Sequence, residues 1–120
     1  MKFQHFESNL IKENEYPKLV RDKTLEIFKQ KTGRDVKSRV LVDDLEYLKF
    51  LLQKIEEEVY ELVHAEGREH QAREVADVLE LFDSLLDLNG LTWEQVMQIK
   101  KKKMDEKGGF KKRILMLEKN

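Results

Sequence analysis

The sequence contains no cysteine, and this absence removes two classes of site at once. Without thiols the chain can form neither a disulfide nor a thiolate metal centre. Proline and glycine are also scarce, with one and five copies in 120 residues. The proline is Pro17, and the glycines fall where we expect helices to break or end, at Gly33, Gly67, Gly90 and Gly108-Gly109.

Neither sign of charge is in excess, because 23 basic residues face 24 acidic ones and the net charge is -1. General nucleic-acid binders usually carry a strong basic excess, so we expect no nucleic-acid partner. The sequence also lacks any apolar run of about 18 residues, so we expect no membrane span and no membrane partner. Its first residues, MKFQHFESNLIKEN, do not resemble a signal peptide, which favours a cytoplasmic protein.

Apolar residues recur at helical spacing through most of the chain, which predicts an all-α fold: a helical bundle with a central antiparallel hairpin. We expect helices over about 22–31, 45–65, 70–89 and 93–107, with an extended connector over 36–42. A polar N-terminal arm, residues 1–15, would precede a single domain over 16–120. The 70–89 helix has apolar residues on more than one side and therefore needs several neighbours. We accordingly expect a homodimer or a higher homo-oligomer.

Paired carboxylates at helical spacing mark the two central helices. Glu58 and Glu61 share one helix face, and Glu74 and Asp77 share another. If the chain turns near Gly67, Glu58 lies level with Asp77 and Glu61 level with Glu74. Four convergent carboxylates repel one another unless a cation neutralises them or some of them hold protons, and an all-oxygen site suits Mg²⁺ or Mn²⁺. The spacing alone leaves open a second interpretation, a solvated acidic face.

These motifs resemble those of the MazG-like, or all-α, nucleoside triphosphate pyrophosphohydrolase superfamily, which includes phosphoribosyl-ATP pyrophosphohydrolase and dimeric dUTPases. The superfamily pattern EExxE, a spacer and ExxD corresponds to residues 57–61 and 74–77, with Lys54-Ile55 leading the first motif. A small MazG-like subgroup also opens with YNKLVRDKIPEII and closes with RGGF and a basic residue. Here the matching segments are YPKLVRDK at 16–23 and KGGFKKR at 107–113.

The chain departs from the subgroup pattern at two places. Thr24-Leu25 replaces Ile-Pro, which we expect only to shift a helix start. Lys107 replaces arginine, which keeps the charge and loses the bidentate geometry that suits phosphate.

The resemblance implies a metal-dependent phosphoanhydride site. Mg²⁺, or Mn²⁺, would be held by Glu58, Glu61, Glu74 and Asp77. Glu57 is the candidate for orienting or deprotonating the attacking water, although it could equally be a ligand, and Glu80 could support the ligands. Basic residues would hold the phosphates, and the candidates are Lys54, Arg21, Lys23, Lys100, Lys103, Lys107 and Arg113.

The expected function is therefore Mg²⁺-dependent hydrolysis of a nucleoside triphosphate, or a related nucleotide, to the monophosphate and pyrophosphate. We expect a house-cleaning enzyme acting on an unwanted or regulated nucleotide. Hydrolysis of phosphoribosyl-ATP in histidine synthesis shares this chemistry and differs in substrate. The third alternative is a non-catalytic helical module that binds a protein or a nucleotide.

Overall fold

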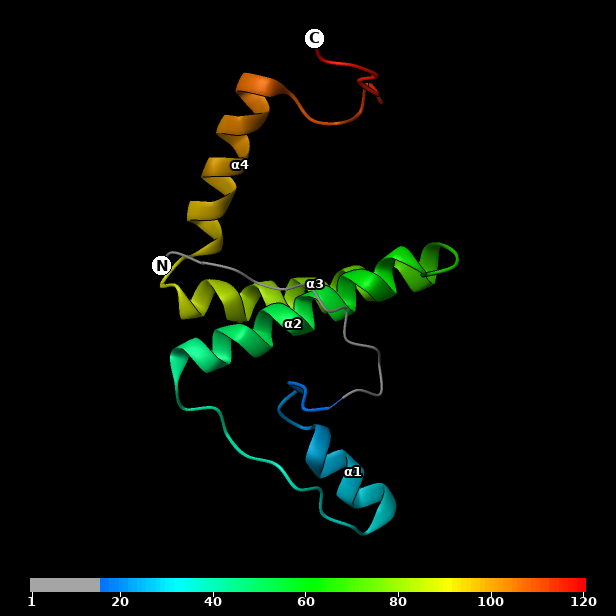
Figure 1. Ribbon diagram of the computed structural model, residues 1–120, viewed down its shortest axis with the longest axis vertical. Helices are drawn as coiled ribbons and strands as arrows, with labels where there is room; N and C mark the ends of the chain where they lie inside the picture. The colour runs from blue at the N-terminus through cyan, green and yellow to red at the C-terminus, as the bar shows by residue number, and fades with distance from the viewer. Residues whose placement is uncertain (1–15) are drawn as a thin grey trace.

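The computed structural model describes residues 16–120, which form four α-helices and no strand. The helices are α1 (Thr24–Thr32), α2 (Asp44–Val63), α3 (Arg68–Leu88) and α4 (Trp93–Lys107) (Figure 1). The predicted all-α fold is thus confirmed. The predicted N-terminal arm, residues 1–15, lies outside the described residues.

Short polar signals in the sequence fix where the helices begin and end. Gly33 closes α1 in the left-handed region, at φ 73°, where a side chain would be strained. The Asp43 carboxylate accepts a hydrogen bond from the Glu46 N–H at the start of α2. Thr92 and Gln95 form a reciprocal capping box at the start of α4. The helix start at α1 was predicted two residues too early, since the chain is in a turn at 22–23.

The centre of the fold is the predicted antiparallel hairpin of α2 and α3, which lie side by side along their length (Figure 1). Its turn ends at Gly67, whose φ of 84° favours glycine. The buried apolar side chains of the described residues are Leu48 and Leu51 from α2 and Val78 from α3. The heptad-like apolar spacing of α2 explains why this helix packs along a neighbour rather than crossing it.

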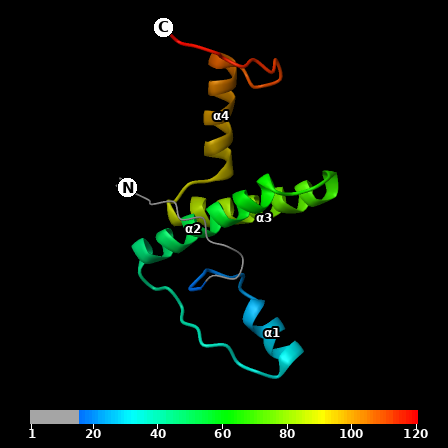
Figure 2. The same cartoon turned by 45° about the vertical axis from the view of Figure 1, so that its right-hand side comes forward.

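The two outer helices project away from this hairpin in both views (Figures 1 and 2). The radius of gyration is 17.8 Å, whereas a compact domain of this length has about 13–14 Å. Many large apolar side chains are therefore exposed, including Met97, Ile99 and Met104 on α4. Among the described helices, none combines the length and apolarity needed to cross a membrane.

Candidate functional site

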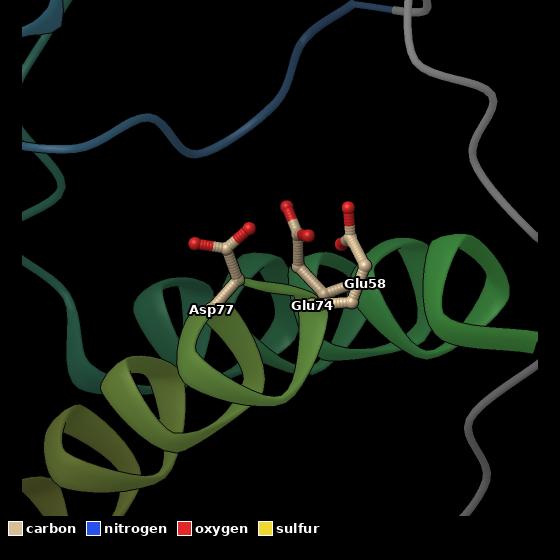
Figure 3. A group of neighbouring side chains, drawn as sticks. All are labelled: Glu58, Glu74 and Asp77. Atoms are coloured by element: carbon tan, nitrogen blue, oxygen red, sulfur yellow. The ribbon is translucent and has the colours of Figure 1, made fainter. Parts of the chain in front are cut away.

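Three carboxylates meet halfway along the hairpin, on the side that faces the segment before α1 (Figure 3). Glu58 comes from α2, and Glu74 and Asp77 come from successive turns of α3. One oxygen atom from each lies within 4.8 Å of the others. Three of the four predicted metal ligands are thus brought together from two helices. Glu61 is half-buried one turn further along α2 and lies outside this group, so its role as a ligand stays a prediction.

Repulsion among the three carboxylates, together with their partial burial, disfavours their ionised forms. Burial is the main cause that raises the pKa of Glu58; Lys54 opposes it, and the charges of Asp77 and Glu74 and a hydrogen bond with Glu74 add to it, so that the pKa reaches about 7. One oxygen of Glu74, Oε2, is buried without a hydrogen-bond partner. A hard divalent cation would neutralise the repulsion and provide a partner for that oxygen. The donor set therefore fits a hard divalent cation.

Beside this group, Glu57 is buried, with 3% of its surface exposed, and it is paired with two ammonium groups. Lys54 Nζ lies 3.1 Å from one Glu57 oxygen, and Lys18 Nζ lies 3.8 Å from the other. Lys54 also lies 3.6 Å from Glu58 and so links the buried carboxylate to the cluster. These cations compete with a water molecule for Glu57, whose predicted role in orienting water stays a prediction.

A cavity of about 550 Å³ lies between this side of the hairpin and the segment before α1. Its walls include two of the cluster carboxylates, Glu58 and Asp77, together with Glu80 one turn further along α3. Three of the predicted phosphate-binding residues also line it: Arg21, Lys23 and Lys54. Arg21 Nη2 donates a hydrogen bond of 2.8 Å to Asp77 Oδ1. The cavity thus has both negative and positive groups on its walls, as a site for a metal–phosphate complex requires.

The other predicted phosphate-binding residues do not line this cavity. Lys100, Lys103 and Lys107 are exposed on α4, and Arg113 is exposed in the tail beyond it. Their roles stay predictions. Sequence reasoning passed over one cation that the structure brings to the site, Lys18, although it lies within the quoted motif at 16–23. The position of Lys18 within that motif could have identified it. Apart from the motif, a single lysine looks the same in the sequence whether it is at a site or on the surface.

A comparison with known protein families matches the part of the chain that contains the carboxylate cluster. The model of a family described as phosphoribosyl-ATP pyrophosphohydrolase matches residues 22–104, which covers α1, the whole hairpin and most of α4. All three clustered carboxylates lie within the matched span. No curated protein and no solved structure matches the chain.

Proposed function

Because this chain belongs to the phosphoribosyl-ATP pyrophosphohydrolase family, whose members are nucleotide pyrophosphohydrolases, we propose that it hydrolyses a nucleoside triphosphate or related nucleotide. The products would be the monophosphate and pyrophosphate, and the reaction would depend on Mg²⁺. The observation that carries this proposal is the three-carboxylate cluster, two of whose members, Glu58 and Asp77, line a cavity that is also lined by cations. House-cleaning is the role we propose. Phosphoribosyl-ATP, the substrate in the family's description, is the alternative.

In the proposed reaction the acidic residues of the site would bind the metal, and the basic residues would bind the phosphates. Glu58, Glu74 and Asp77 would hold the cation, and Glu61 could complete the ligand set from the next turn of α2. Once bound, the cation would offset the negative charge that develops on the phosphoryl oxygens. Without that positive charge the three carboxylates would repel a triphosphate, since both carry negative charge.

The cations of the cavity would orient the substrate. Arg21 and Lys23, from the segment before α1, would contact phosphate oxygens from the side opposite the helices. Lys54 would stay on the helix side, where Glu57 fixes its ammonium group at 3.1 Å. Because Glu57 already orders the Lys54 side chain, little side-chain entropy is lost when the substrate binds and its phosphates contact this ammonium group.

A direct test measures pyrophosphate release from a panel of canonical and modified nucleotides and phosphoribosyl-ATP, with and without Mg²⁺. We expect Mg²⁺-dependent release together with a nucleoside monophosphate or its phosphoribosyl counterpart. Asp77→Asn should lower kcat/KM by about a hundredfold, since it removes the negative charge of a metal ligand. Asp87→Asn is the matched control, because Asp87 is exposed on the same helix and does not line the cavity.

Equal rates in the two variants would refute the site assignment. Absence of release from every nucleotide, with no metal binding by calorimetry, would favour the non-catalytic module instead.

We also propose that a second copy of the chain covers the hairpin on the side opposite the carboxylates. On α3, positions 75, 79, 82 and 86 form an apolar stripe with steps of four, three and four, opposite Asp77 on the helix. Val75 and Leu79 are 44% and 47% exposed. On α2, the neighbouring apolar face is also open, with Leu45, Val59 and Val63 exposed.

A second copy is the occupant that these observations favour. The described residues bury only three apolar side chains, so the hairpin needs a permanent partner rather than an occasional one. A face of two antiparallel helices pairs with its own copy by a two-fold axis to give a four-helix bundle. This arrangement leaves the carboxylate side of both hairpins open to substrate.

Light scattering during size-exclusion chromatography tests the second copy. We expect the wild-type chain to elute as a dimer or a higher oligomer. Leu79→Arg should dissociate it or make it insoluble, whereas Val40→Arg, at an exposed position of the connector, should not. A monomeric wild-type protein, or an oligomer unaffected by Leu79→Arg, would exclude this interface.

A further inference from the structure

Arg21 is placed to contact two different kinds of partner in the same cavity. Its guanidinium donates a hydrogen bond to Asp77, a member of the carboxylate cluster 56 positions away in the sequence. The same group lines the cavity in which the phosphates of the proposed substrate would lie. Guanidinium binds carboxylate and phosphate with similar geometry, so the two partners are alternatives for one side chain.

The contact with Asp77 is open to water and therefore weak. The Arg21 side chain is 61% exposed and that of Asp77 is 38% exposed, and such pairs contribute at most about 1 kcal/mol. The Lys54–Glu57 pair differs, because its side chains are only 17% and 4% exposed. Exchange of the partner of Arg21 therefore costs little, whereas the Lys54–Glu57 pair is fixed.

The segment that carries Arg21 is attached at both ends. Residues 18–21 have no regular structure, and Lys18 is paired with buried Glu57 at one end of this stretch. At the other end the Thr24 N–H donates to the Arg21 carbonyl, where α1 begins. A rotation of the Arg21 side chain can therefore shift the guanidinium between Asp77 and the cavity without detaching the segment from α2.

We propose that Arg21 is a positioning residue that exchanges between Asp77 and a substrate phosphate, and so links metal binding to phosphate binding. The inference rests on the proposed function for its second partner. A divalent cation and the Arg21 guanidinium both draw on the negative charge of Asp77, so each weakens the binding of the other. When the guanidinium transfers to phosphate, Asp77 becomes a stronger ligand and the phosphate gains a charge-assisted hydrogen bond. Metal and nucleotide should therefore bind cooperatively through this one side chain.

The test measures two affinities in one set of variants of the full chain. Mn²⁺ binding alone is followed by electron paramagnetic resonance. Nucleotide binding in saturating Mg²⁺ is followed by calorimetry with an ATP analogue that has a methylene group between the α- and β-phosphorus atoms. Arg21→Gln should bind Mn²⁺ up to about fivefold more tightly, the factor that corresponds to loss of a competing exposed pair. The same variant should bind the analogue about tenfold more weakly, because a charge-assisted hydrogen bond is lost.

Two further variants separate this exchange from a general loss of charge or of structure. Lys23→Gln removes one positive charge from the same segment without removing a hydrogen bond to Asp77, so its Mn²⁺ affinity should rise less. Arg21→Lys keeps the charge and should restore part of the analogue affinity. A merely structural role for Arg21 predicts that both affinities fall together in Arg21→Gln.

The inference is overturned if Mn²⁺ affinity is unchanged or lower in Arg21→Gln, or if the analogue affinity is unaffected. Because the Mn²⁺ titration requires no turnover, it distinguishes a failure of this inference from a failure of the proposed reaction. A chain that releases no pyrophosphate, yet shows both opposite shifts, would retain Arg21 as the link and lose only the hydrolytic activity.

Discussion

Glu58→Gln should stabilise the protein in chelator and remove the stabilisation that a metal provides. Burial and the neighbouring carboxylates raise the folded-state pKa of Glu58 to about 7, against an ordinary value of 4.5. The folded chain therefore holds a proton that the unfolded chain releases, and its stability falls as pH rises from about 4.5 to 7. Above pH 7 the full penalty of an ionised Glu58 remains. Glutamine has nearly the same shape and carries no charge at any pH.

The magnitude follows from the size of the pKa difference. A gap of about 2.5 pKa units, at about 1.36 kcal/mol each, sets an upper limit of about 3 kcal/mol. Solvent reduces this value because 16% of the Glu58 side chain is exposed, and we expect about 1 to 2 kcal/mol. For a chain of this size that corresponds to an increase in Tm of roughly 4 to 10 °C. In saturating Mg²⁺ the wild type should have the higher Tm of the two. The bound cation stabilises the folded wild type through its carboxylates, and the variant lacks one of these charged ligands.

Thermal unfolding followed by far-ultraviolet circular dichroism tests this reasoning at about pH 5 and about pH 8, in chelator and in saturating Mg²⁺. Glu66→Gln is the control, since Glu66 is exposed in the turn between α2 and α3 and lies outside the cluster. The explanation fails if Glu58→Gln has no higher Tm than the wild type at pH 8 in chelator. It fails equally if the gain is as large at pH 5, where the wild-type carboxyl is already protonated.

Three more substitutions test separate parts of the fold. Lys54→Met should lower the free energy of unfolding by about 2 kcal/mol or more in urea titrations, because it leaves buried Glu57 with Lys18 alone, at 3.8 Å; a neutral effect would refute the pair. Gly67→Ala should cost about 1 to 2 kcal/mol in the same assay, since φ is 84° there although no atom obstructs a Cβ. Thr92→Ala should reduce the protection of the first α4 amides from hydrogen exchange, by an amount equivalent to about 1 kcal/mol; unchanged protection would show that the capping box is dispensable.

The hairpin could be predicted from the sequence because its signals are local and redundant. Apolar spacing, the break at Gly67 and the carboxylate pairs all specify one antiparallel register. Glu58 meets Asp77 as that register predicts, whereas Glu61, predicted level with Glu74, lies outside the group. The cap residues Asp43 and Thr92 were predictable for the same reason, since each acts within three positions.

The surroundings of the site could not be predicted in this way. The pairing of Glu57 with Lys18, and of Arg21 with Asp77, depends on where an irregular segment passes over the helices. No periodicity encodes that path. The sequence alone also could not separate Lys54, which lines the cavity, from Lys100 and Lys103, which are exposed on α4 and do not line it. A lysine on an exposed helix face looks the same in both situations.

The small apolar core and the half-buried acidic cluster have one physical consequence in common. Within residues 16–120 only Leu48, Leu51 and Val78 are buried apolar side chains, and such a core offers little stability to offset an ionised Glu58 and an unpartnered Glu74 oxygen. The two partners proposed above would supply further stabilisation: a cation at the carboxylates and a second copy of the chain on the opposite side of α3. Both act on the same pair of helices, so each should raise the apparent affinity for the other. Saturating Mg²⁺ should therefore shift the monomer–oligomer equilibrium towards the oligomer in sedimentation experiments, and in Asp77→Asn this shift should be lost while the Mg²⁺-independent association persists.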